Sequence, residues 1–239
     1  MPTSVTAYNL LEACREPGCP VCRLEQRSVE RYLDNLFYEN VNSSGVRENL
    51  RLSMGFCREH AWMTVNQNLG DALGFAIIYH DVIGATLERL DKDVPPPTRR
   101  WAGLLKRIPE EVSARVYKAV FALTPQKHCP VCQKRDEMLS TIVSELVENI
   151  GQPEMADALQ ASDGLCMPHL RQALQSVQDV AACEKLIDIH REKLETLHAD
   201  LAELIRKNDY RFMKEELGKE GNSWLRAVAM TVGNTKSRR

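Results

Sequence analysis

Apolar residues return at intervals of three and four along most of the chain. Spacing of this kind places them on one face of an α-helix, where they can be buried together. The pattern is clearest in residues 22–40, 130–149 and 177–207. Strand signals, which would alternate apolar and polar residues, are nearly absent. The pattern therefore predicts an all-α protein built as a helical bundle.

Residues 71–90 carry a near-heptad stripe, which suits a helix that packs against a partner helix. The stripe consists of Leu73, Ile77, His80, Ile83, Leu87 and Leu90. Because His80 lies within this stripe, we interpret it as a hydrogen-bonded core histidine and not as a metal ligand.

The layout of helices occurs twice, which indicates an internal duplication into two pseudo-symmetric repeats. Three consecutive prolines, Pro95 to Pro97, separate the copies because they cannot continue a helix. We expect four parts: a metal-binding repeat over residues 1–93, a connector over 94–110, a second metal-binding repeat over 111–207, and a C-terminal tail over 208–239 that packs across the bundle.

Each copy contains a Cys-Pro-Val-Cys sequence followed by a Cys-x-x-His sequence. The two are separated by 34 intervening residues in the first copy and 33 in the second. Three thiolates and one imidazole form a closed tetrahedral set for zinc. Taken in chain order, the spacing predicts that each repeat is clamped by its own Cys3His site. The first would be Cys19, Cys22, Cys57 and His60; the second would be Cys129, Cys132, Cys166 and His169.

The spacing within each pair explains why these residues can act together. Proline is favourable at the first helical position, so each Cys-Pro-Val-Cys sequence predicts a helix start. Residues three apart share one helix face, and the positive end of the helix dipole stabilises a thiolate. Gly55 and Gly164 precede the Cys-x-x-His pairs and would let the chain turn tightly into a second helix.

Two alternatives to zinc deserve comparison. Dithiol redox catalysis also uses a Cys-Pro-x-Cys sequence, but it needs a strand before the motif and a βαβ context, which the pattern lacks. A [4Fe–4S] cluster is held by four side chains as well, most often four cysteines. The histidine in both copies favours two zinc ions per chain, with [4Fe–4S] left open as the alternative.

Composition narrows the range of functions. The 239 residues are 44% hydrophobic and 27% charged, with a formal net charge of −2. These are ordinary values for a soluble globular protein. Two filled sites would bring the charge to roughly −4, because three thiolates outweigh one divalent cation. The chain thus lacks the basic footprint of a nucleic-acid-binding domain.

The sequence also indicates a location. The first eleven residues have no basic region followed by a long apolar stretch, so no secretory signal is visible. The most apolar window, residues 74–79, is too short to span a bilayer. Closely spaced cysteines without an export signal point to reduced thiols. We expect a cytoplasmic protein with no membrane partner.

Several further segments resemble those of an uncharacterised prokaryotic family, domain of unknown function family 6062. The segments are EPGCPVC, LFYENVN, GFCREHAW, GDALGFAIIYHD, CPVC, GLCMPH, DYRF and SWLRA. The resemblance covers nearly the whole chain and includes all eight ligand positions. It implies a helical metal-binding protein of bacteria or archaea, and it implies no activity.

These observations favour a non-enzymatic role without settling whether any activity exists. Closed sites leave no open coordination position for chemistry, and no phosphate loop, nucleophile elbow or HExxH sequence is present. The leading hypothesis is a structural scaffold or protein-interaction module whose partner is another protein. The alternative is an iron–sulfur protein in redox or electron transfer. The second alternative is a nucleic-acid-binding regulator.

Overall fold

The computed structural model describes residues 4–92, 110–212 and 214–234. Within these ranges it contains helices and no strand, which confirms the all-α prediction. The α-helices are α1 Val5–Cys14, α2 Pro20–Asn35, α3 Ser44–Ser53, α4 Arg58–Asn66, α5 Ala72–Asp91, α7 Glu110–Ala122, α8 Pro130–Asn149, α9 Pro153–Ala161, α10 Met167–Ser176, α11 Val180–Lys207 and α12 Ser223–Val232. A π-helical turn, Leu36–Asn40, extends α2, and a 3-10 turn, Lys219–Asn222, leads into α12. Apart from Glu110, the predicted connector over residues 94–110 lies outside the described residues.

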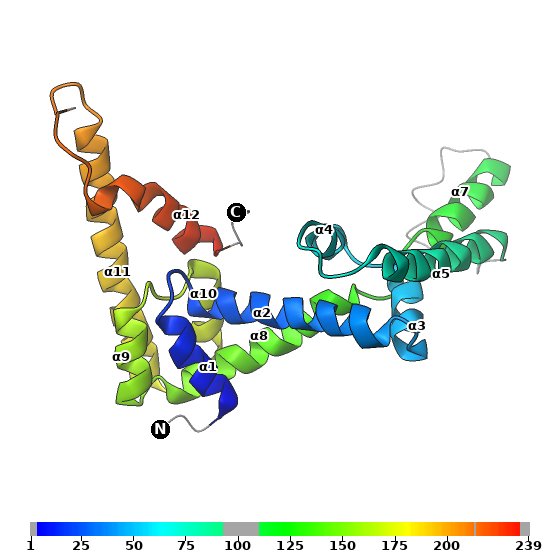
Figure 1. Ribbon diagram of the computed structural model, residues 1–239, viewed down its shortest axis with the longest axis horizontal. Helices are drawn as coiled ribbons and strands as arrows, with labels where there is room; N and C mark the ends of the chain where they lie inside the picture. The colour runs from blue at the N-terminus through cyan, green and yellow to red at the C-terminus, as the bar shows by residue number, and fades with distance from the viewer. Residues whose placement is uncertain (1–3, 93–109, 213, 235–239) are drawn as a thin grey trace. The chain divides into compact units, whose positions relative to one another are not determined.

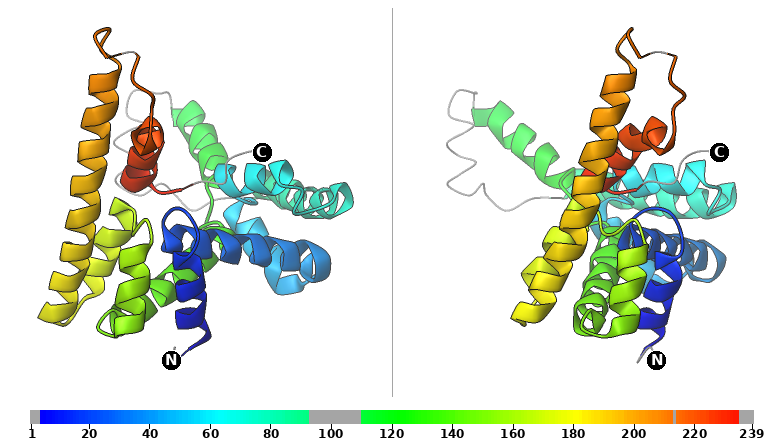
Figure 2. Two further views of the ribbon diagram at one scale, coloured as in Figure 1. Left: turned by 60° about the vertical axis from the view of Figure 1, so that its left-hand side comes forward. Right: turned by 90° about the vertical axis from the view of Figure 1, so that its left-hand side faces the viewer.

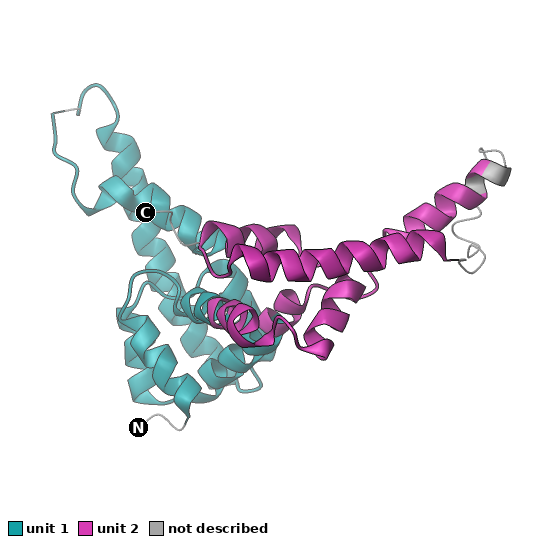
Figure 3. Ribbon diagram, turned by 45° about the vertical axis from the view of Figure 1, so that its right-hand side comes forward, with its two compact units in different colours: residues 1–28, 136–239 teal, residues 29–135 magenta. Residues whose placement is uncertain are grey.

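The chain divides into two compact units, coloured separately in Figure 3. Unit 1 contains residues 1–28 and 136–239, and unit 2 contains residues 29–135. The divisions fall inside α2 and α8. Each of these helices therefore begins in one unit and ends in the other.

Unit 1 is organised around α11. This helix packs against α9, α10 and α12, and α1 packs against α9 (Figures 1 and 2). Its start is fixed by Asp179, whose side chain accepts a hydrogen bond from the Ala182 N–H. The core is aliphatic, and its fully buried side chains include Leu10, Ile142, Leu146, Ile150, Leu159, Leu165 and Leu186.

Unit 2 is built on α5, which packs against α3 and α7. The Phe37 ring lies against Phe75 with ring centroids 4.7 Å apart. A Cβ added at Gly70 or Gly74 would lie within 3 Å of the Phe37 ring, so these glycines make room for it. The buried side chains of this core include Val29, Leu33, Leu36, Leu50, Ile78 and Val82.

The prediction that the stripe over residues 71–90 is the packed face of its helix, with His80 in the core, is wrong. The buried residues of α5 are Gly74, Ile78 and Val82. His80 is exposed, and so are Leu73, Ile83 and Leu87 from the predicted seam. The helix therefore turns the neighbouring stripe toward the core. Phe37 and the two glycines it requires determine this choice, and their contacts are not visible in the spacing of α5 alone.

Glu220 holds the corner between α11 and α12. Its carboxylate accepts hydrogen bonds from Lys207 Nζ and from the Gly218 N–H, each at 2.7 Å. The bond from Lys207, followed by that from Gly218, lowers the pKa of Glu220 from 4.5 to about 2. A carboxylate with a depressed pKa in the folded state stabilises the fold above its unfolded pKa, and this contribution is lost as the pH falls toward the folded pKa.

We therefore expect the stability advantage of wild type over Glu220→Gln to be full above pH 5 and to shrink between pH 4.5 and 2. Thermal midpoints followed by circular dichroism across this range measure the difference. The matched control is Glu216→Gln, at an exposed carboxylate of the same segment. A wild-type advantage that does not vary with pH would contradict the role of the Glu220 charge.

Candidate metal centres

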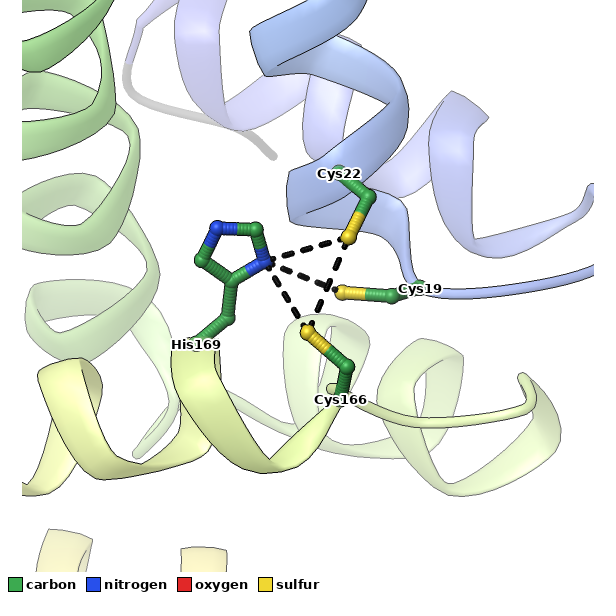
Figure 4. A group of neighbouring side chains, drawn as sticks. All are labelled: Cys19, Cys22, Cys166 and His169. Carbon is green, nitrogen blue, oxygen red and sulfur yellow. Dashed lines mark hydrogen bonds between the residues drawn. The ribbon is translucent and has the colours of Figure 1, made fainter. Parts of the chain in front are cut away.

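The structure gathers the eight predicted ligands into two clusters. Within each cluster, the ligand atoms all lie within 4.8 Å of one another. The unit 1 cluster comprises Cys19, Cys22, Cys166 and His169, whose side chains point toward a common centre in Figure 4. The unit 2 cluster comprises Cys57, His60, Cys129 and Cys132.

The predicted pairing along the chain is wrong. Each Cys-Pro-Val-Cys pair meets the Cys-x-x-His pair of the other copy, so neither cluster is formed within one predicted repeat. The spacing of the two copies is nearly the same, and either combination supplies three sulfurs and one imidazole. Ligand chemistry therefore could not distinguish the two pairings.

Helix length explains the observed pairing. At 1.5 Å per residue, α2 carries the chain about 24 Å from its start, and α8 carries it about 30 Å. The end of α2 belongs to unit 2, and so does the next Cys-x-x-His pair, at Cys57 and His60. The end of α8 belongs to unit 1, and so do Cys166 and His169. Each long helix thus leads away from the cluster at which it begins.

The predicted helix starts are confirmed. Cys19 and Cys129 directly precede Pro20 and Pro130, the first residues of α2 and α8. Cys57 and Cys166 are the N-cap residues of α4 and α10, with extended backbone. All four of these cysteines therefore lie at the amide-rich end of a helix, whose dipole stabilises negative charge.

The distances in unit 1 fit one four-coordinate ion. His169 Nδ1 lies 3.5 Å from Cys19 Sγ, 3.3 Å from Cys22 Sγ and 3.3 Å from Cys166 Sγ. The sulfurs of Cys22 and Cys166 are 3.6 Å apart. Bonds of about 2.3 Å to sulfur and about 2.0 Å to nitrogen give tetrahedron edges of about 3.8 Å between sulfurs and about 3.5 Å between sulfur and nitrogen.

The unit 2 cluster has similar dimensions and greater exposure. His60 Nδ1 lies 3.2 Å from Cys57 Sγ, 3.4 Å from Cys132 Sγ and 3.8 Å from Cys129 Sγ, and the sulfurs of Cys57 and Cys132 are 3.6 Å apart. All four unit 1 ligands are buried, whereas Cys57 and Cys132 are half-buried. The two centres therefore share a donor set and differ in access to water.

Hydrogen bonds within the unit 1 cluster shift the pKa values of Cys19 and Cys22 in opposite directions. Bonds with Cys166 and Cys22 lower the pKa of Cys19. A bond with Cys166, then one with Cys19, raises the pKa of Cys22. Burial adds to the rise at Cys22, because desolvation disfavours a thiolate. A divalent cation at the centre would supply the missing opposite charge.

Glu25 orients the unit 1 imidazole. Its Oε2 lies 3.4 Å from His169 Nε2, while Nδ1 of the same ring faces the sulfurs. Burial lowers the pKa of His169, but hydrogen bonds with Cys166, Cys19 and Glu25 outweigh it and raise the pKa to about 11. A carboxylate behind a ligating histidine fixes the ring orientation and increases ligand basicity. Glu25 is a supporting residue that sequence analysis missed.

A side-chain acceptor, buried in unit 1 and half-buried in unit 2, supports the turn before each Cys-x-x-His pair. In unit 1, His190 Nε2 accepts a hydrogen bond from the Leu165 N–H at 2.8 Å, and His190 Nδ1 lies 2.7 Å from the Leu186 carbonyl, to which it donates. In unit 2, the Tyr79 hydroxyl is hydrogen-bonded to the backbone of Phe56. Tyr79 and His190 lie on α5 and α11, the helices that follow the two Cys-x-x-His helices. Tyr79, and not its neighbour His80, therefore supports the turn that leads to the candidate ligands of unit 2.

Replacing His190 by alanine will destabilise unit 1 by about 1–3 kcal/mol, because a buried N–H at Leu165 loses its acceptor. Urea unfolding of the metal-loaded protein measures the change. His198→Ala is the matched control, since His198 is an exposed histidine of the same helix. Equal effects of the two substitutions would show that the bond to Leu165 contributes nothing.

The remaining cysteines lie outside the clusters. Cys14 is buried in the unit 1 core, where it packs as a small apolar residue, and burial raises its pKa to about 11. Cys183 is half-buried on α11. His128, which adjoins Cys129 and could have competed for the metal, is exposed.

These observations define a helical protein with two Cys/His clusters, each able to hold a metal ion. The chain belongs to a family of unknown function (DUF6062), whose model matches residues 1–238. It is 24% identical over 228 residues to an "Uncharacterized 23.9 kDa protein in xynA 3'region" of Caldicellulosiruptor sp. (strain Rt8B.4). That alignment covers 94% of this chain and 99% of the relative. No solved structure matches the chain. Within the described residues, no helix combines the length and apolarity that a membrane crossing requires.

Proposed function

We propose that this protein is a non-enzymatic helical scaffold, stabilised by two structural zinc ions and able to bind another protein. One observation carries the metal assignment: in both clusters the histidine Nδ1 lies 3.2–3.8 Å from all three sulfurs, and one pair of sulfurs is 3.6 Å apart. These match the edges of a tetrahedron around a single ion.

The same distances weigh against an iron–sulfur cluster. A [4Fe–4S] cluster places four irons between its ligands, so the ligand atoms must stand further apart than around one ion. Histidine in both clusters also suits zinc, for which Cys3His is a common structural set. Four protein ligands fill the four positions, so the centres would act by holding helices together.

Each ion would hold together segments that are distant in sequence. In unit 1 it would fasten the start of α2 to the start of α10, and in unit 2 the start of α4 to the start of α8. Because such a site does not exist in the unfolded chain, the free energy of metal binding contributes to folding. The zinc would thus keep the helices in place for a binding surface.

The outward face of α5 supports a protein partner. Leu73 is 70% exposed, and Ile83 and Leu87 are each 58% exposed. Large apolar side chains gathered on one helix face are typical of surfaces that another helix can cover. The net charge of −2 gives no support to nucleic acid as the partner. We propose the cytoplasm, where thiols stay reduced, as the location.

Metal analysis of protein purified without oxygen tests the proposal. We expect two zinc ions per chain, no absorption near 400 nm and no redox activity. A brown preparation with iron and sulfide would reject zinc and support the electron-transfer alternative. Filter binding to DNA and RNA at low salt is expected to be negative. Salt-sensitive binding there would support the regulator alternative.

A further inference from the structure

The segment after α12 lies directly on the unit 1 cluster. The Asn234 N–H donates a hydrogen bond to Cys22 Sγ at 3.4 Å. The Cys19 N–H donates to Asn234 Oδ1 at 3.0 Å. One residue near the C-terminus therefore bonds to both cysteines of a pair more than two hundred positions earlier in the chain.

Two glycines permit this approach. Gly18 has φ +88° and Gly233 has φ +89°, a region that disfavours residues with a Cβ. A Cβ at Gly18 would lie 2.7 Å from the Asn234 side chain, and one at Gly233 would lie 3.1 Å from Cys22 Sγ. The backbone on both sides of the contact is therefore shaped for close packing between the C-terminal segment and the sulfurs.

Helix α12 also borders a cavity that reaches the cluster. The cavity has a volume of about 500 Å³. Its lining includes the ligands Cys19 and Cys166 together with Leu225, Ala229, Met230 and Asn234 from the C-terminal segment. Arg226 fastens α12 to α11 through Asp200 at 2.8 Å. The C-terminal segment thus forms part of the wall of a cavity that adjoins the ligands.

We infer that Asn234 and the turn at Gly233 form an outer shell of the unit 1 metal centre and slow the release of its ion. This inference rests on the proposed function, since it requires metal in that cluster. A backbone N–H bonded to a thiolate offsets part of the net negative charge of a Cys3His centre. The bond from the Cys19 N–H to the Asn234 side chain holds that donor in position. In unit 2, Cys57 and Cys132 are half-buried, so release from that centre is expected to be faster.

Zinc release to a chromogenic chelator, followed by stopped flow, tests the inference. We expect two phases in the wild-type protein, and the Cys132→Ser variant identifies the fast phase as unit 2 by losing it. Removal of residues 233–239 deletes both hydrogen bonds and should accelerate the slow phase about 10- to 100-fold, the range in which outer-shell substitutions weaken metal binding. Asn234→Ala, which keeps the backbone N–H, should accelerate it by a smaller factor.

Removal of residues 235–239 alone is the matched control and should leave both phases unchanged. Far-UV circular dichroism establishes that each variant is folded. The zinc content before mixing should be two ions per chain in the C-terminal variants and one in Cys132→Ser, which lacks a unit 2 ligand. A slow phase that is unaffected in both the 233–239 deletion and Asn234→Ala would overturn the inference while leaving the zinc proposal intact. Absence of zinc from the wild-type protein would overturn the proposed function itself.

Discussion

Replacing Cys19 and Cys166 together by serine will remove one metal ion per chain and leave the other bound at wild-type affinity. Both residues belong to the unit 1 cluster, which would keep only one cysteine and one histidine. The unit 2 cluster would retain all four of its ligands. Metal content after dialysis against a competing chelator, measured by atomic emission, gives the result.

The matched comparison is the double substitution of Cys19 and Cys57. These residues belong to different clusters in the structure, so neither centre keeps four ligands and both ions should be lost from the dialysed protein. Pairing in chain order leads to the opposite pair of results. One retained ion in the Cys19/Cys57 variant, with none in the Cys19/Cys166 variant, would refute the observed arrangement.

Removing the metal will unfold the protein at neutral pH. Structural zinc in small domains binds with apparent free energies of about 10–16 kcal/mol. Whole domains are stable by only about 5–15 kcal/mol. Loss of both ions is therefore expected to abolish most of the helical signal in circular dichroism at 25 °C. Readdition of zinc under reducing conditions should restore it.

A chelator already saturated with zinc is the control for direct effects of the reagent on the fold. Each cluster joins helix starts that belong to the core of its own unit, so the effect should appear as lost helix and not only as lost metal. A helical signal and thermal midpoint unchanged after complete metal removal would contradict a stabilising role.

The features of the fold that depend on neighbouring residues could be predicted from the sequence. A proline after a cysteine, a second cysteine three positions later, and apolar residues at helical spacing all report on neighbouring residues. They were sufficient to predict the all-α fold and the helix starts at Pro20 and Pro130, both of which the structure confirms. The metal content of the clusters stays a prediction.

The pairing of the clusters depends on the path of the chain between them. The first copy alone contains a complete Cys3His ligand set, with 34 residues between its two pairs. No local feature of the sequence argues against a metal site formed within that copy. The length of α2 and of α8 decides the pairing, together with the unit in which each helix ends. Single-sequence patterns give helix lengths but not the direction in which the chain leaves a helix.

Supporting residues were missed for a related reason. Tyr79, His190 and Asn234 act on backbone groups or sulfurs of another element, so no spacing within their own segments distinguishes them. The stripe on α5 was misassigned because both of its neighbouring faces carry apolar residues. Contacts with Phe37 selected the face that contains Gly74.

The division of the chain sets an order for its assembly during translation. Unit 2 is one continuous stretch, residues 29–135, inserted between the two parts of unit 1. A ribosome delivers all four ligands of the inserted unit before it reaches residue 166, so the inner centre can close first. Cys19 and Cys22 are the first of the eight ligands to emerge and must stay reduced until Cys166 and His169 have followed them. The ligand thiols that are synthesised first are therefore the last to find their partners.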